Sequence, residues 1–172
     1  MNQLMRKIFT LAGLLLALSC LPHAALAAVC PGATVTSTGV SFGNYDPISG
    51  AAVTSSGTIT VTCGGGTATP IISIQLSAGD SGVFSQRFMK DTTTGANTLN
   101  YNLYVDATYA STSIWGDGTA GTLDPGGTTA GHGGNTLIVT VYGQIPANQD
   151  AYAGCTVTGC SYSDTITITI NF

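Results

Sequence analysis

Apolar and polar residues alternate with a period of two in one segment of this chain after another. The clearest case is the C-terminal stretch Thr165–Phe172, which reads TITITINF. Because successive side chains of a β-strand point to opposite faces, this period is typical of a half-buried antiparallel strand. The same pattern predicts strands over Thr34–Phe42, Thr58–Cys63, Ile71–Leu76, Leu99–Val105 and Leu137–Ile145, with a shorter candidate over Val83–Met89. Six or seven short strands separated by Gly- and Asn-rich turns predict an all-β, immunoglobulin-like β-sandwich.

The N-terminus has the three parts of a bacterial export signal. Arg6 and Lys7 form a basic start, an apolar run follows, and Ala25 and Ala27 occupy the small-residue positions of a cleavage site. The apolar run, residues 8–21, is short for a membrane helix, which needs roughly 20 residues. We therefore predict a signal peptide over residues 1–27, a single β-sandwich domain over 28–172, secretion through the periplasm, and no membrane span after cleavage.

Charge excludes one class of partner. Beyond residue 27, two basic residues, Arg87 and Lys90, stand against eight aspartates, and there is no glutamate. Nucleic acid is not an expected partner, because lysine and arginine supply the affinity for phosphate backbones. The cluster Arg87–Lys90 is interpreted as a solvated strand end.

Four cysteines remain once Cys20 is assigned to the signal peptide: Cys30, Cys63, Cys155 and Cys160. An even number of cysteines in an oxidising compartment indicates disulfides. A reversal of the chain near Asp46 would place Cys30 beside Cys63, and a tight turn would join Cys155 to Cys160, so these are the predicted pairs. A zinc site is the alternative, but the spacing and the single histidine of the domain fit zinc poorly.

No residue pattern indicates an enzyme. His132 lies in a glycine-rich loop without an identifiable partner, so it gives no catalytic triad. The aspartates are scattered over turns, and no cofactor or metal ligand set is expected. Trp115 and Asp117 are possible ligand contacts, for example with a sugar, but a tryptophan packed in the sandwich and an aspartate capping its turn are the simpler interpretations.

The terminal strand raises a question of its own. It is uncharged and β-branched, and an exposed edge of this kind aggregates unless another segment covers it. Either a loop or strand of the same chain covers it, or a partner donates a strand. In the second case a groove beside Thr165–Phe172 has a floor formed by Ile166, Ile168, Ile170 and Phe172.

Several segments, in order along the domain, resemble the spore coat protein U domain family, which includes subunits of archaic chaperone–usher pili. They are VSFGNYDP at Val40–Pro47, GTITVTC at Gly57–Cys63, LNYNLY at Leu99–Tyr104, WGDG at Trp115–Gly118, VYGQIP at Val141–Pro146 and YSDT at Tyr162–Thr165. The resemblance implies a sandwich that lacks its final strand, a periplasmic chaperone and an outer-membrane usher as partners, and completion by a strand from a neighbouring subunit. It also agrees with a Cys30–Cys63 bridge.

The resemblance favours a structural subunit of a surface pilus. Only Ala28 and Val29 would precede Cys30 after cleavage, which is too short for a donor strand, so an end position in the fibre, at the tip, is expected. Two alternatives remain open. One is a monomeric secreted carbohydrate-binding module that uses Trp115 and the loop 116–134, and the other is a spore or cyst coat component.

Overall fold

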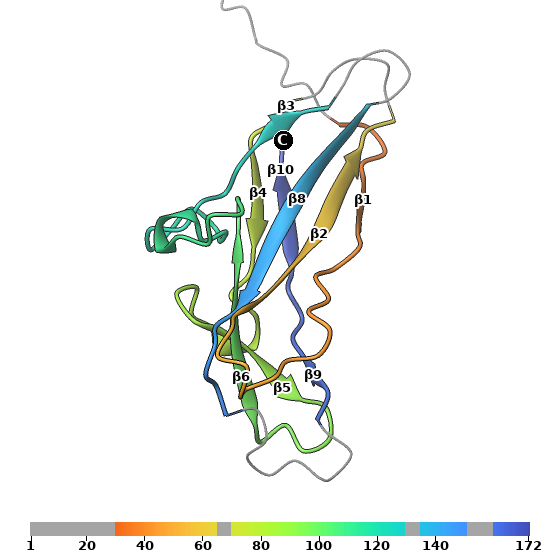
Figure 1. The fold of residues 1–172 in the computed structure, drawn as a ribbon. Helices are drawn as coiled ribbons and strands as arrows, with labels where there is room; N and C mark the ends of the chain where they lie inside the picture. The colour runs from red at the N-terminus through yellow and green to blue at the C-terminus, as the bar shows by residue number, and fades with distance from the viewer. Residues whose placement is uncertain (1–29, 65–69, 130–134, 151–159) are drawn as a thin grey trace, which may run out of the picture.

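The computed structural model describes residues 30–64, 70–129, 135–150 and 160–172. These residues form strands joined by turns, with two short 3-10 turns, η1 (Gly79–Ser81) and η2 (Ser111–Ser113), and no α-helix. The strands form two layers around one apolar core (Figure 1).

The larger layer is a curled sheet of six strands. Its order is β1 (Thr34–Ser37), β2 (Val53–Thr62), β8 (Thr136–Ile145), β6 (Thr98–Tyr104), β5 (Arg87–Asp91) and β9 (Tyr162–Ser163). The antiparallel pair β2 and β8 is its longest part, in register from Val53 opposite Ile145 to Thr62 opposite Thr136. Ile59 and Val61 of β2 point into the core, while the threonines between them point outward, as the period of two requires.

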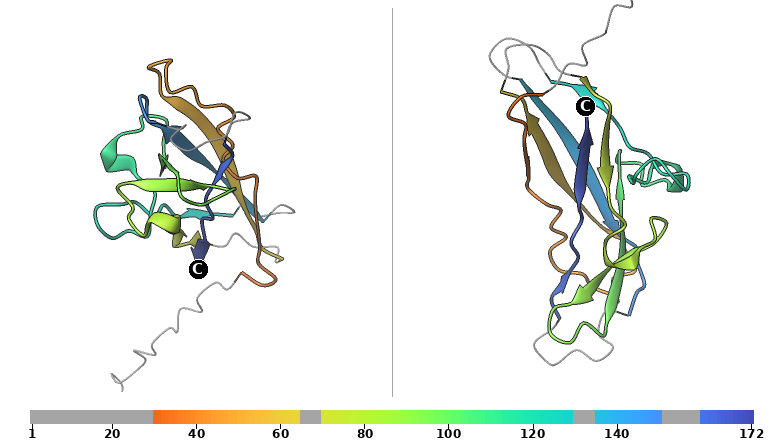
Figure 2. Two further views of the ribbon diagram at one scale, coloured as in Figure 1. Left: turned by 90° about the horizontal axis from the view of Figure 1, so that it is seen from below. Right: turned by 180° about the vertical axis from the view of Figure 1, so that it is seen from behind.

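The second layer is smaller and contains the C-terminal strand. Here β10 (Ile168–Asn171) pairs with β4 (Ser73–Leu76), and β3 (Pro70–Ile71) pairs with β7 (Gly127–Thr128). On its other side β4 is bonded to loop backbone, with the Ile74 and Leu76 amides donating to the carbonyl oxygens of Pro125 and Gly116, each at 2.9 Å. Seen from behind, β10 runs between β2 and β4 (Figure 2).

A strand lies in each predicted segment, but the bounds differ. The candidate over Val83–Met89 begins only at Arg87, and Ile71–Leu76 is divided between β3 and β4, which have different partners. The strand predicted to reach Phe42 ends at Ser37, because the chain turns away at Gly39, which has a φ of +66°. The terminal strand is shorter than the predicted Thr165–Phe172: residues 168–171 form β10 and pair with β4 in the small sheet. Residues 162–163, which precede the predicted strand, pair with β5 in the large sheet. The chain thus crosses from one layer to the other at residues 164–167.

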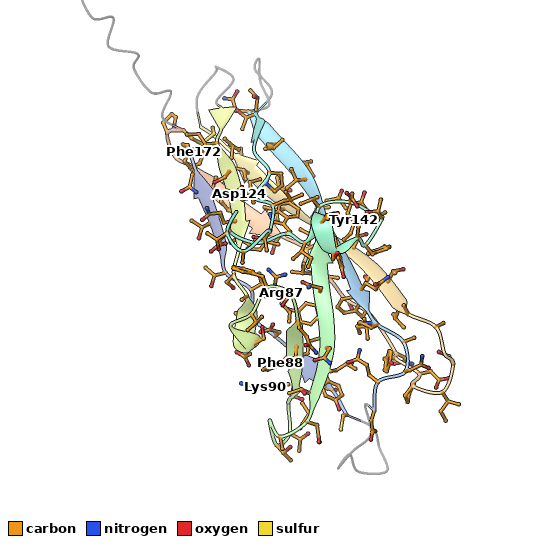
Figure 3. The ribbon with its side chains drawn as sticks, turned by 90° about the vertical axis from the view of Figure 1, so that its left-hand side faces the viewer. Arg87, Phe88, Lys90, Asp124, Tyr142 and Phe172 are labelled. Carbon is orange, nitrogen blue, oxygen red and sulfur yellow. A yellow bond between two sulfur atoms is a disulfide. The ribbon has the colours of Figure 1, made fainter. Side chains whose placement is uncertain are left out.

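The interpretation of Arg87–Lys90 as a solvated strand end is wrong for Arg87. Its side chain is fully buried, at 0 % exposure, and its guanidinium donates to the carbonyl oxygen of Ser77 at 2.8 and 3.0 Å, to Asn102 Oδ1 at 2.7 Å and to the carbonyl oxygen of Trp115 at 2.7 Å. Lys90, three residues on, is partly exposed and forms an ion pair with Asp80 at 3.1 Å. Figure 3 shows the positions of the two residues.

Together the layers form an all-β, immunoglobulin-like sandwich, as predicted from the alternation. Its core is a cluster of aliphatic and aromatic side chains from both sheets, with Trp115 among the most buried.

Candidate functional site

An apolar cavity of about 320 Å³ lies between the two layers, on the side where β10 has no second neighbour among the described strands. One wall is the chain that follows β1, and the other is the chain from β9 to β10. Its apolar lining consists of Val40, Phe42, Ile59, Leu76, Met89, Tyr101, Leu103, Val141, Tyr162, Ile166 and Ile168. We call this cavity the groove.

The first wall depends on the close approach of two backbone segments. After Thr38, whose amide donates to the carbonyl oxygen of Thr58 at 3.1 Å, the chain crosses over Gly57 on β2. A Cβ on Gly57 would lie 2.0 Å from the carbonyl oxygen of Gly39, so only glycine fits there. The crossing turns Val40 inward, where it lines the groove.

Phe42 completes this wall. Its ring packs edge-on against the ring of Tyr101, with 5.9 Å between the centroids. A Cβ on Gly143 of β8 would come within 2.8 Å of the Phe42 ring, so this glycine makes room for the aromatic side chain.

The second wall is the free edge of β10. The carbonyl oxygen of Thr167 accepts the Ser77 amide at 3.0 Å, so the backbone groups of Thr167, Thr169 and Asn171 face β4. In an antiparallel ladder the alternate residues present their N–H and C=O groups to the opposite edge. The backbone of Ile168 and Ile170 therefore faces away from β4, and within the described residues β10 has no other strand partner.

The groove continues into a second cavity of about 880 Å³. Both cavities are lined by Val40, Phe42, Met89 and Tyr162. The second is more polar and ends near Asp46 and Cys160, so the open space follows the length of the segment 160–168.

One carboxylate lies on the groove wall. Asp164 accepts the Tyr101 hydroxyl on Oδ2 at 2.7 Å and the amides of Asp80 and Thr165 on Oδ1 at 3.0 and 2.7 Å. Burial, followed by this hydrogen bond to Asp164, raises the pKa of Tyr101 well above its ordinary value. The phenol therefore stays protonated and keeps donating to Asp164.

The four predicted floor residues differ in position. Ile166 and Ile168 line the groove, and Ile170 packs against the core cluster. Phe172, at the end of the chain, is 39 % exposed (Figure 3). That a foreign strand pairs with this edge stays a prediction. Sequence reasoning missed the opposite wall, Val40 and Phe42, which alternate with Ser41 but are out of phase with Val35 of β1.

The Cys30–Cys63 pairing is confirmed. The two sulfur atoms are bonded, the Cα atoms are 5.0 Å apart, and both residues are buried. This bridge fixes the start of β1 to the end of β2. Cys160 is also disulfide-bonded, but Cys155 lies outside the described residues, so the pairing of Cys155 with Cys160 stays a prediction.

Trp115 is not placed to bind a ligand. It is 1 % exposed, and its indole N–H donates to the carbonyl oxygen of Ile74 at 2.7 Å, so neither face of the ring is open for a sugar to stack. The carboxylate of Asp117 accepts the amide and the hydroxyl of Thr119 at 2.9 and 2.6 Å, which is the turn-capping role. Both interactions hold the loop together.

His132 and part of the loop 116–134 lie outside the described residues, as does the predicted signal peptide. The part of the chain that the structure describes contains no cluster of three or more His, Cys or acidic side chains able to hold a metal ion. The same residues contain no helix long and apolar enough to cross a membrane.

Known proteins resemble this chain in sequence and in fold. The family model of the Spore Coat Protein U domain matches residues 17–169. None of the curated proteins matches the chain at a significant level. Among solved structures, the fold resembles a chain in the crystal structure of the CsuC–CsuE chaperone–tip adhesion subunit pre-assembly complex from the archaic chaperone–usher Csu pili of Acinetobacter baumannii. The TM-score is 0.50 at 19 % sequence identity, and the match covers 84 % of this chain but 40 % of that one.

Proposed function

This chain belongs to the spore coat protein U domain family, and we propose that it is a structural subunit of a bacterial surface pilus, completed by a strand that a partner donates. The observation that carries this proposal is the groove. An apolar space lies open between the layers, and the backbone edge of β10 borders it without a strand partner among the described residues.

A donated strand would make two kinds of contact there. Its backbone would pair with the N–H and C=O groups that Ile168 and Ile170 present at the edge of β10. Its alternate side chains would enter the groove, where each large apolar side chain removed from water contributes about 1.5–3 kcal/mol. Several such side chains, together with the backbone ladder, make a long-lived contact.

The partners we propose are a periplasmic chaperone during transit, an outer-membrane usher, and neighbouring subunits in the fibre. Residues 1–27 supply the export signal, and the protein then reaches the cell surface. The similar fold found in a chaperone–tip subunit complex of Csu pili supports a chaperone as the first strand donor.

Co-expression tests this function. The protein is exported either alone or with a periplasmic chaperone from an archaic chaperone–usher system. We expect the protein alone to aggregate or to be degraded, because the edge of β10 has no strand partner among the described residues. The co-expressed pair should elute as one soluble complex in size-exclusion chromatography. A folded monomer obtained without any chaperone would contradict the proposal and would favour a self-contained secreted module. Immunogold labelling then separates fibres on the cell surface from a spore or cyst coat.

We propose further that the subunit accepts a strand without giving one, and so stands at an end of the fibre. This rests on the predicted cleavage after Ala27, which leaves two residues before Cys30. Purified, chaperone-bound protein mixed with itself should then form no chains. Ladders of multimers that survive detergent without heating would show that it does donate a strand.

A further inference from the structure

We propose that Asp164 makes the groove selective for a donor strand that brings a lysine or arginine beside it, and against one that brings an acidic residue. This inference rests on the proposed function, since it specifies the chemistry of the strand that the groove accepts.

Asp164 belongs to a row of alternate residues along the groove whose other members have apolar or aromatic side chains. From β9 to β10 the groove is lined by Tyr162, Ser163, Asp164, Ile166 and Ile168, and every second residue of this segment, namely Tyr162, Asp164, Ile166 and Ile168, is partly buried while those between are exposed. Side chains at this spacing share one face of an extended chain. A donor strand that places its own side chains among this row therefore brings one of them next to the Asp164 carboxylate.

This carboxylate has no ion-pair partner among the described residues. Arg87 is close enough to attract it, but the guanidinium is bonded to Ser77, Asn102 and Trp115, and Lys90 is paired with Asp80. Among the described residues that line the groove, Asp164 is the single charged side chain. A cation brought by the donor would thus be the first to pair with it.

The hydrogen bonds described for the carboxylate leave one of its lone-pair sites unused. An ionised carboxylate offers about four lone-pair sites, two on each oxygen. Among the described residues, Oδ1 accepts two amides, from Asp80 and Thr165, and Oδ2 accepts the Tyr101 hydroxyl. The remaining site on Oδ2 suits an ammonium, guanidinium or amide N–H of the donor.

Water is displaced when the strand enters, and this increases the effect of charge. In a partly desolvated groove, opposite charges attract more strongly than in water, and like charges repel more strongly. An acidic donor residue would face Asp164 and would also lose its own hydration. A neutral donor residue would bind with an affinity between those of a basic and an acidic one.

Synthetic donor peptides test the inference on the full exported protein, purified in complex with its chaperone, so that a labelled peptide binds by taking the place of the chaperone strand. The parent peptide, about ten residues long to follow the groove, alternates valine with threonine. Each inward valine is replaced in turn by Lys, Gln or Glu, and binding is measured by fluorescence anisotropy. In a matched control peptide the same three residues replace an outward threonine. This control measures how much of the difference in binding comes from the overall negative charge of the protein. The protein variants are Asp164→Asn, which keeps the size and the Oδ1 acceptor, and Asp106→Asn, which removes a charge outside both cavities.

At one inward position we expect Lys to bind more tightly than Gln, and Gln more tightly than Glu, with about tenfold or more between Lys and Glu, equivalent to about 1.4 kcal/mol or more. This order should disappear in Asp164→Asn and persist in Asp106→Asn. Equal binding of the Lys and Glu peptides by the native protein, or an order that survives in Asp164→Asn, would overturn the inference and make Asp164 a structural acceptor only. If Asp164→Asn does not fold, binding of the Lys, Gln and Glu peptides to the native protein is compared at low and at high salt. A difference in affinity that this ion pair causes becomes smaller at high salt, so this comparison decides. Failure of the parent peptide itself to bind would instead refute the proposed function.

Discussion

At the scale of single residues, Arg87 is the largest departure from ordinary expectation. A charge is expensive to bury unless hydrogen bonds replace its hydration. Here the guanidinium donates to three acceptor groups, the carbonyl oxygen of Ser77 after β4, Oδ1 of Asn102 on β6 and the carbonyl oxygen of Trp115. It therefore joins both layers at a point where no aliphatic side chain would satisfy these oxygen atoms.

Replacing Arg87 with Met should lower the free energy of unfolding by at least about 3 kcal/mol, because it leaves buried acceptors without donors. The matched control is Lys90→Met on the same strand, whose partly exposed ion pair with Asp80 should contribute less than about 1 kcal/mol. Urea unfolding of both variants measures the difference. Equal losses of unfolding free energy in the two variants would show that the hydrogen bonds of Arg87 contribute no more than the partly exposed ion pair of Lys90.

Asp91 gives the fold a sensitivity to acid. Its carboxylate accepts the backbone amides of Thr93, Thr94 and Asn97 and the Thr94 hydroxyl, closing the turn between β5 and β6. These bonds, that from the Thr94 amide first, hold the pKa of Asp91 well below its ordinary value. Because the pKa is lower in the folded state, the stability that Asp91 contributes is present at neutral pH and is lost as the pH falls below about 4.

We expect Asp91→Asn to be less stable than the native protein at pH 7 and to lose less stability on acidification. Thermal unfolding followed by circular dichroism from neutral to acidic pH provides the comparison. Parallel pH profiles for the two proteins would show that Asp91 does not control this transition.

At the scale of elements, the two faces of β10 have different surroundings. Ile168 points into the groove and packs against the core, whereas Thr169, the next residue, points to solvent. The same strand therefore offers a matched pair of substitutions that differ only in the face they change.

Ile168→Asp should abolish the capture of a donor peptide and weaken folding, because it places an unpaired charge in an apolar space. Thr169→Asp introduces the same charge on the exposed face and should leave capture nearly unchanged. Ile168→Ala separates binding from folding, since it should still fold but bind the peptide more weakly. Undiminished capture by both Ile168 variants would mean that the donor strand does not enter beside β10.

The crossing of the segment after β1 over β2 also belongs to this scale. Gly57→Ala would bring a Cβ into the backbone of Gly39, which cannot move aside as a flexible side chain does. We expect a loss of about 1–3 kcal/mol in unfolding free energy, the usual cost of overpacking. Ser56→Ala, one residue earlier on the exposed face, should change stability little. Native stability in the Gly57→Ala variant would show that the crossing adjusts without strain.

At the scale of the whole molecule, one layer has six strands and the other leaves an edge open beside an apolar space, among the residues that the structure describes. A sandwich in this state gains stability from any strand that completes it. The two layers meet along the groove, so occupation of the groove acts on the stability of the entire domain and not only on β10.

The midpoint of thermal unfolding should therefore rise with the concentration of donor peptide. A ligand that binds only the folded state contributes about 2.7 kcal/mol at one hundred times its Kd. A peptide of the same composition in scrambled order, without alternation, is the control. A midpoint that responds equally to both peptides, or to neither, would contradict an incomplete sandwich.

The sequence by itself determined the class of fold and most of its strands. Alternation over Thr58–Cys63, Leu137–Ile145 and Thr165–Phe172 is a local property, because it follows from which face of a strand meets water. The Cys30–Cys63 bridge could also be predicted from the sequence, since it follows from two antiparallel strands and their lengths. Only the tertiary structure decided the burial of Arg87, the passage of the C-terminal segment from one sheet to the other, and the wall formed by Val40 and Phe42. These depend on which acceptors and which glycines come from distant parts of the chain, and a local pattern carries no record of such neighbours.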